Sequence, residues 1–132
     1  MGDLTRNFNL SEFRCKDGAP VPDKYYTNVQ KLAENLQKIR DIIDEPLVIV
    51  SGYRTPEHNR TCGGAKHSQH LTASAADLRC SLSPDELRQV ILDLIESGEI
   101  MQGGLGLYDT FVHYDIRGTK ARWDERKNKD TK

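Results

Sequence analysis

The chain has 132 residues, of which 36% are hydrophobic and 30% are charged, which predicts one water-soluble domain with a single modest core over residues 1–132. Its 19 Lys and Arg residues nearly balance 20 Asp and Glu residues, giving a net charge of −1. Bulk charge therefore gives no reason to expect nucleic acid or an anionic membrane as a partner. No apolar run approaches the roughly 20 residues of a membrane span, and the first residues lack the apolar stretch of a secretory signal. We expect a monomer made in the cytoplasm without a signal peptide.

The chain contains three cysteines, Cys15, Cys62 and Cys80, and no CxxC motif. An odd number without that spacing argues against a disulfide framework and against a zinc knuckle built from cysteines. A single bridge between Cys62 and Cys80 stays open as an alternative, and three free thiols are the expectation.

The first half of the chain predicts an irregular arm, one long helix and one strand. Residues 1–22 place Leu10 and Phe13 among turn-forming residues, with a short turn at 11–13. Apolar residues then recur at spacings of three and four over 26–43, which predicts a helix that ends before Pro46. The apolar run 47–50 predicts a central strand that is buried on both faces.

The second half predicts a helix between strands. Residues 75–78 form a short strand candidate, and Ser83, Pro84 and Glu86 form the capping box of a helix that Gly98 closes. Residues 105–108 and 111–116 are separated by two residues, which predicts an antiparallel hairpin. From Arg122 the sequence is dense in charge without periodicity, and we expect a solvated tail that includes 124–132.

This order of elements predicts an α+β fold, with helices packed on a small antiparallel sheet. One connection, from Ser51 to Asp77, is too long to be a simple link in so small a domain, and such loops usually carry function. It contains three of the four histidines, His58, His67 and His70. The fourth, His113, lies within the last predicted strand.

Two histidines and one aspartate could form a zinc site, since zinc takes three or four N, O or S ligands. His70 and Asp77 are seven residues apart and could meet at one ion across a bend that is followed by a strand, with His113 joining from a neighbouring strand. Spacing alone is a weak signal for this set. His67 is a competitor of His70, whereas His58 is expected on the surface of a short turn.

The sequence motifs that contain these residues are more specific than the spacing of the three candidate ligands. Ser51-Gly52-Tyr53-Arg54 is followed by Gly63-Gly64-Ala65, by Ser68, His70, Ala75 and Asp77 in the spacing SxHxxGxAxD, and by His113 on a late strand. In this the chain resembles the zinc D-Ala-D-Ala carboxypeptidase family of peptidoglycan peptidases, which shares its fold with the hedgehog signalling domain. The resemblance is greatest to the short single-domain bacterial or phage members and covers about residues 8–123.

The resemblance implies that His70, Asp77 and His113 bind one zinc ion. It implies that Arg54 stabilises an oxyanion or binds a substrate carboxylate, and we place Ser68 and Tyr53 with Arg54 as substrate-binding residues. Trp123 is more often a packing residue than a cleft wall.

Two positions depart from the family pattern. Ala73 stands where the family has glycine, a substitution that is costly if the backbone there needs a positive φ. Many members carry an acidic base three residues before the last histidine, where this chain has Thr110. Asp115, two residues after His113 on the same strand face, is our candidate for a catalytic or orienting carboxylate. Asp109 and Glu57 are the rivals.

The implied function is zinc-dependent hydrolysis of peptidoglycan peptide bonds next to D-amino acids, as an endolysin-type endopeptidase or a carboxypeptidase. Such an enzyme would reach the cell wall after lysis or by a non-classical route. Two alternatives stay open: a zinc-stabilised binding module that has lost hydrolysis, and a structural part of a phage or secretion particle.

Overall fold

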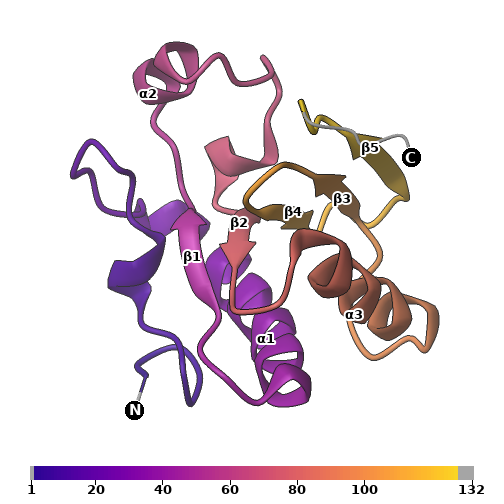
Figure 1. Cartoon of the computed structure of the whole chain (residues 1–132). Helices are drawn as coiled ribbons and strands as arrows, with labels where there is room; N and C mark the ends of the chain where they lie inside the picture. The colour runs from indigo at the N-terminus through magenta and orange to yellow at the C-terminus, as the bar shows by residue number, and fades with distance from the viewer. Residues whose placement is uncertain (1, 128–132) are drawn as a thin grey trace.

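The computed structural model describes residues 2–127 and has an α+β architecture, as the sequence predicts (Figure 1). Its helices are α1 (Tyr26–Ile43), α2 (Pro56–Thr61) and α3 (Pro84–Glu96), with 3₁₀ turns η1 (Leu10–Phe13), η2 (Asp23–Tyr25) and η3 (Gln69–Thr72). The strands are β1 (Val48–Ser51), β2 (Ala75–Arg79), β3 (Gly104–Leu107), β4 (Val112–Asp115) and β5 (Ala121–Asp124).

The five strands form one sheet in the order β1-β2-β4-β3-β5. The pairs β1–β2, β2–β4 and β3–β4 are antiparallel, but β3–β5 is parallel. The four strands that the sequence predicts are thus antiparallel, and the unpredicted β5 adds a parallel pair at one edge. The turn after β4 carries the chain past β3, so that β5 adds on the far side of the hairpin.

The predicted tail is also wrong over 122–124, because these residues belong to β5. Backbone hydrogen bonds with the β3 region order this segment: the Ala121 N–H donates to Gly103 O (3.4 Å) and the Glu125 N–H to Leu107 O (2.8 Å). Such bonds need no apolar periodicity, so the charged sequence hides the strand. The rest of the predicted tail, from 128 onward, lies outside the described residues.

β1 is an edge strand, which corrects the prediction of a central strand buried on both faces. Its apolar run does bury Leu47 and Ile49, but Val48 is 39% exposed. Among the described strands, only β2 pairs with it, and the N-terminal arm lies along its other side, where η1 contacts it. A local apolar run reports burial but not the number of neighbouring strands.

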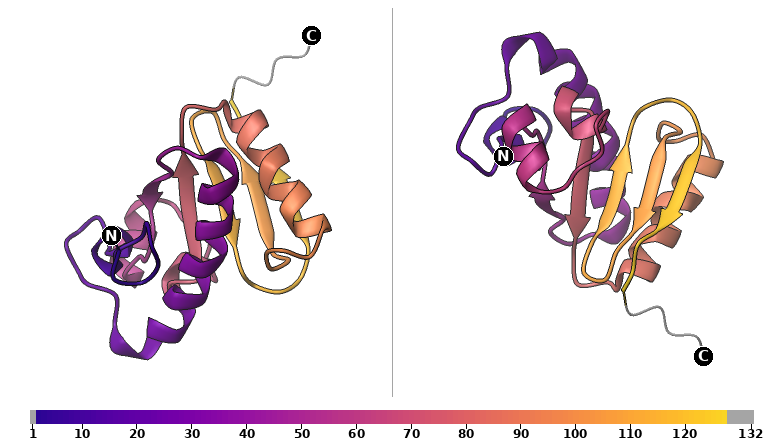
Figure 2. Two further views of the ribbon diagram at one scale, coloured as in Figure 1. Left: turned by 90° about the horizontal axis from the view of Figure 1, so that it is seen from below. Right: turned by 90° about the horizontal axis from the view of Figure 1, so that it is seen from above.

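Both long helices form where the sequence predicts them. α1 spans the predicted residues and ends at Asp44, which adopts the left-handed conformation (φ 54°). α3 begins at the predicted capping box, with Ser83 and Glu86 satisfying each other's backbone N–H groups. Figure 2 shows α1 and α3 side by side against one face of the sheet, with α2 beyond the opposite face. In the part of the chain that the structure describes, no helix combines the length and apolar character needed to cross a membrane.

The N-terminal arm is packed tightly on the domain. Phe8, Phe13 and Cys15 are each 1% exposed, and the carbonyl of Phe13 accepts a hydrogen bond from the Tyr53 N–H (2.8 Å). A Cβ at Gly52 would lie 2.8 Å from that carbonyl oxygen, so the close approach requires glycine. The arm thereby fixes the start of the long loop that carries the candidate site.

Candidate metal centre

One row of residues crosses the whole sheet and carries the predicted site. The register pairs Ser51 with Asp77, Asp77 with His113, His113 with Gly106, and Gly106 with Trp123. Residues directly opposite each other on adjacent strands have Cβ atoms about 4.5–5.5 Å apart and share a face. Strand pairing alone therefore places Asp77 beside His113.

His70 reaches the same place through a tight bend. It lies in η3, whose N-cap Ser68 accepts a hydrogen bond from the His70 N–H (3.1 Å). Ala73 then adopts the left-handed conformation (φ 59°, ψ 32°) and turns the chain into β2. The position does need a positive φ, at a cost of about 1–2 kcal/mol for a residue with a Cβ, which explains why the family has glycine there.

The three predicted ligands converge on one point. Asp77 Oδ1 lies 3.3 Å from His70 Nε2 and 3.2 Å from His113 Nδ1. One ligand atom of each residue lies within 4.8 Å of the other two, and all three residues are buried. Ligand atoms around a tetrahedral zinc ion are separated by about 3.3–3.8 Å, given bond lengths of about 2.0–2.3 Å. The two measured separations are close to the lower end of this range, so the three atoms can surround a small metal ion.

The second nitrogen of each histidine has a partner that determines which nitrogen carries the proton. His70 Nδ1 lies 2.6 Å from the carbonyl oxygen of Gly52, which can only accept, so Nδ1 donates and Nε2 keeps its lone pair. His113 Nε2 lies 2.7 Å from Asp115 Oδ2 and donates to that carboxylate, leaving the Nδ1 lone pair free. Two imidazole lone pairs and a carboxylate therefore face one another, an arrangement that a cation stabilises.

The pKa values of the ligands report the same convergence. Burial alone would raise the pKa of Asp77, but hydrogen bonds that it accepts from His113 and His70 when these rings are protonated hold it well below its usual value. Burial likewise lowers the pKa of His113, but the carboxylates of Asp115 and Asp77 outweigh burial and raise it. The carboxylates therefore favour positive charge at the point where the two imidazoles meet Asp77.

Arg54 lies against this triad. Its Nη2 is 3.4 Å from Asp77 Oδ2, the oxygen that does not face the histidines, and its Nη1 donates to Asn59 Oδ1 (3.2 Å). Asn59 is 4% exposed and donates to the carbonyl of Ala65 (2.9 Å). The guanidinium is thus held at the ligands by α2 and by the loop that follows it.

Asp115 lies behind His113 and is fully buried. Besides His113 it accepts hydrogen bonds from the Gly104 N–H (2.8 Å) and from the guanidinium of Arg117 (2.9 and 2.8 Å). A Cβ at Gly104 would lie 2.3 Å from its Oδ2, so glycine makes room for the carboxylate. Burial raises the pKa of Asp115, but hydrogen bonds from His113, Arg117 and Gly104 lower it by more. Of the two roles left open, this geometry supports orienting His113.

A cleft of about 990 Å³ opens over the triad. Trp123 forms part of its wall, with its ring centroid 5.0 Å from that of His113. A Cβ at Gly106 would lie 2.2 Å from the indole nitrogen, so the missing side chain lets the ring reach across β3. The cleft is lined by residues from five segments, most of them polar or aromatic: Arg54, 62–70, Asp77, Tyr108, Phe111, His113, Arg117, Trp123, Glu125 and Lys127.

The other predicted candidates divide between the cleft and the rest of the molecule. Ser68 and His67 line the cleft. Tyr53 does not, since it is 7% exposed in the hydrophobic core and packs against Tyr25 at a centroid distance of 6.1 Å. His58 lies on α2 rather than on a simple turn, and neither it nor the rival acid Glu57 is among the cleft residues.

Three groups that hold the site residues in place are not predicted from the sequence: the carbonyl of Gly52, Asn59 and Arg117. A backbone carbonyl leaves no mark in the sequence. Arg117 could have been found, because residues two apart extend from one side of an extended chain and it follows Asp115 by two. Asn59 lies within a helix of six residues that has no apolar periodicity.

Comparison with known families gives a match to a family model described as Peptidase M15, over residues 5–115. The matched segment includes all three metal-ligand candidates, Arg54 and Asp115. No curated protein matches the chain.

Proposed function

The chain belongs to the Peptidase M15 family, whose members are metal-dependent peptidases, and we propose that it uses one zinc ion to hydrolyse peptide bonds next to D-amino acids in peptidoglycan. The observation that carries the proposal is the convergence of His70 Nε2, Asp77 Oδ1 and His113 Nδ1 at the bottom of a cleft. Three protein ligands leave one position of a tetrahedral ion for water or substrate.

The chemistry of these donors suits zinc. Neutral imidazole and carboxylate are its usual N and O ligands, and a bound zinc ion supplies polarisation of a carbonyl and a water molecule of lowered pKa. The chain's own residues prepare the ligands: Gly52 O and Asp115 hold the two imidazoles in the required tautomers.

Arg54 supplies positive charge beside the ligands. Its side chain is 15% exposed, so it is largely withdrawn from water, where its attraction for an anion is stronger. In the proposed reaction it binds either the oxygen of the cleaved amide as negative charge develops or a carboxylate of the substrate.

The charge of the cleft favours an acidic peptide. Arg54, Lys66, Arg117 and Lys127 line it, against Asp77 and Glu125 as carboxylates. Peptide stems of peptidoglycan carry free carboxylates and would be attracted by this surface. The protein would meet them after cell lysis or by a non-classical delivery route.

Hydrolysis also needs a group that takes a proton from the attacking water and passes it to the leaving amine. Asp115 is fully buried and already accepts from Gly104, Arg117 and His113, so we assign it the orienting role. Among the described residues that line the cleft, Glu125 is the carboxylate that is not a ligand candidate. We propose Glu125 as the proton carrier.

Digestion of purified peptidoglycan tests the proposal. Released fragments are identified by mass spectrometry with native protein, with chelated protein and after zinc is restored. We expect cleavage that the chelator abolishes and zinc restores. Release of single D-amino acids would identify a carboxypeptidase, and separation of cross-linked stems an endopeptidase.

Variants give the controls. Glu125→Gln should bind zinc normally and lose activity, whereas His67→Gln, which changes another cleft residue, should keep activity. A protein that binds zinc at the triad and cleaves no peptidoglycan peptide would overturn the proposal in favour of a binding or structural module. Full activity of Glu125→Gln would overturn only the assignment of the proton carrier.

A further inference from the structure

A second group of metal-ligating side chains lies outside the triad. Cys15, Asp17 and His58 each offer a ligand atom, and these atoms lie within 4.8 Å of one another. Cys15 and Asp17 come from the N-terminal arm, whereas His58 comes from α2. The group shares no residue with the site proposed above and joins segments about 40 residues apart in the sequence.

The three donors are of different kinds: a thiol from Cys15, a carboxylate from Asp17 and an imidazole from His58. Cys62 contacts His58, with its Sγ 3.3 Å from His58 Nε2, but its sulfur is not part of the group. Thiolate, imidazole and carboxylate together form a donor set that selects zinc or a similar transition-metal ion.

The ligand atoms are held in place before any ion binds. The Thr55 N–H donates to Cys15 Sγ (3.5 Å) and the Thr55 hydroxyl donates to Asp17 Oδ2 (2.8 Å). The Ala19 N–H donates to Asp17 Oδ1 (2.9 Å). Cys15 is buried and His58 is partly buried, but Asp17 is exposed, so an ion can reach the group from solvent.

From this geometry we propose a second metal site, formed by Cys15, Asp17 and His58, that takes zinc or a similar transition-metal ion. The ion clamps the arm to α2. Because Arg54 precedes the Thr55 cap of α2 and Asn59 on α2 holds the Arg54 guanidinium, the clamp steadies the segment that carries Arg54.

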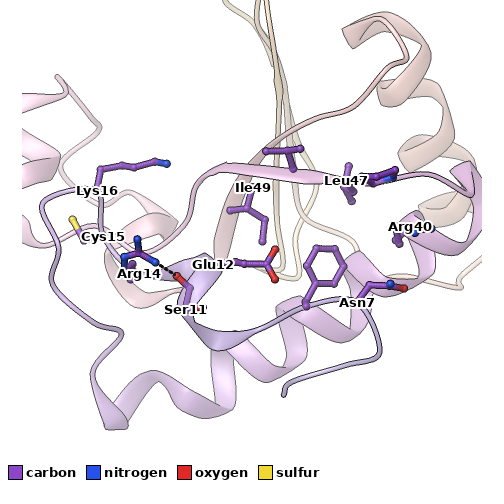
Figure 3. A pocket seen from close by; sticks show the side chains of 12 residues that line it. Asn7, Ser11, Glu12, Arg14, Cys15, Lys16, Arg40, Leu47 and Ile49 are labelled. Carbon is purple, nitrogen blue, oxygen red and sulfur yellow. Dashed lines mark hydrogen bonds between the residues drawn. The ribbon is translucent and has the colours of Figure 1, made fainter. Parts of the chain in front are cut away.

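Part of the arm lies over a hollow beside the proposed site. A hollow of about 540 Å³ separates part of the arm from β1, lined by residues that include Glu12, Arg40 and Ile49. Figure 3 shows the Cys15 sulfur at one end of this hollow, away from Arg40 at the other. The proposed ion would fasten the arm at the end where Cys15 lies.

Cobalt binding to the reduced full-length protein tests the proposal, because cobalt reports its own ligands. The triad holds no sulfur, so a thiolate-to-cobalt charge-transfer band in the near-ultraviolet can arise only from a cysteine-containing site. We expect two equivalents of Co²⁺ per chain and this band. His70→Ala should lose one equivalent and keep the band.

Cys15→Ser should lose the band and the other equivalent, and Cys80→Ser, a cysteine outside the group, should keep both. If Cys15→Ser fails to fold, Asp17→Asn at an exposed position provides the test, with an expected loss of affinity at the second site of at least about tenfold. A single equivalent and no band in the native protein, or equal spectra for Cys15→Ser and Cys80→Ser, would overturn the second site while leaving the triad untouched.

Discussion

The two histidines of the candidate metal centre are held by different means. His113 donates to a buried carboxylate, Asp115, that is itself fixed by Arg117 and by the backbone of Gly104. His70 donates to the backbone carbonyl of Gly52. One ligand is therefore oriented by side-chain charge on neighbouring strands, and the other by the path of the main chain.

Because the supports differ, different substitutions should disturb the orientation of the two histidines. Substitution of one side chain removes the support of His113, but no substitution removes the carbonyl that supports His70. That carbonyl stays in place because the arm packs on the loop, where the Tyr53 N–H donates to Phe13 O (2.8 Å). We expect substitutions in the sheet to disturb the orientation of His113, and substitutions in the N-terminal arm to disturb that of His70.

Loss of either histidine should have the largest effect, because it removes a ligand rather than its support. His70→Ala and His113→Ala should each lose the zinc of the triad and reduce peptidase activity to background. Metal analysis of purified protein measures the first result, and peptide release measures the second. His67→Ala serves as the matched control and should keep both, whereas full zinc content in both ligand variants would refute the assignment.

Arg54→Ala should separate metal binding from turnover. The variant keeps all three ligands, so zinc content should stay native, but loss of one charge-stabilising donor should reduce kcat by about 10²–10³. Arg54→Lys keeps the charge without the forked geometry and should recover part of the loss. Native turnover in Arg54→Ala would show that the guanidinium only supports Asp77.

Asp115→Asn tests the side-chain support of His113. The change keeps the shape of the side chain but weakens its hold on His113 Nε2, and loss of such a partner typically lowers metal affinity about 10–100-fold. We expect excess zinc to restore most of the activity, as measured by titration of the chelated protein. An orienting carboxylate predicts this rescue, whereas a proton carrier would leave the variant inactive at saturating zinc.

The sequence predicts those elements of the fold that depend on local patterns. Apolar spacing and a capping box predict α1 and the start of α3 because each depends on neighbours within one or two turns. The edge position of β1 and the existence of β5 do not follow from local patterns. Both are set by which strands pair, and pairing joins residues that are distant in the sequence.

The candidate site likewise has residues that the sequence predicts and groups that it does not. His70, Asp77, His113 and Arg54 follow from a resemblance carried by their motifs, and the pairing of Asp77 with His113 explains why the motifs work. Tyr53, in the same SGYR motif, lies in the core because alternate residues of an extended segment face opposite sides. The carbonyl of Gly52 and the amide of Asn59 act through positions that only the folded loop creates.

Glu45 offers a second carboxylate fixed by neighbouring donors, this time at the surface, and should show the smallest effect. It accepts from the Ser81 N–H (2.8 Å) and hydroxyl (2.6 Å), tying the turn before β1 to the segment before α3. These bonds hold the pKa of Glu45 below its ordinary value, which is about 4.3. The ionised form is thus favoured in the folded state, and its stabilisation is present above the ordinary pKa and lost as the pH falls through the lower, folded value.

Thermal unfolding of native protein and Glu45→Gln between about pH 3 and pH 7 measures this contribution. We expect the native protein to have the higher Tm at neutral pH and the difference to close in acid, where the native side chain is also uncharged. Glu96→Gln, at an exposed glutamate at the end of α3, controls for the removal of one surface charge. A difference in Tm that stays constant with pH would mean that Glu45 stabilises the fold through its shape and not through its charge.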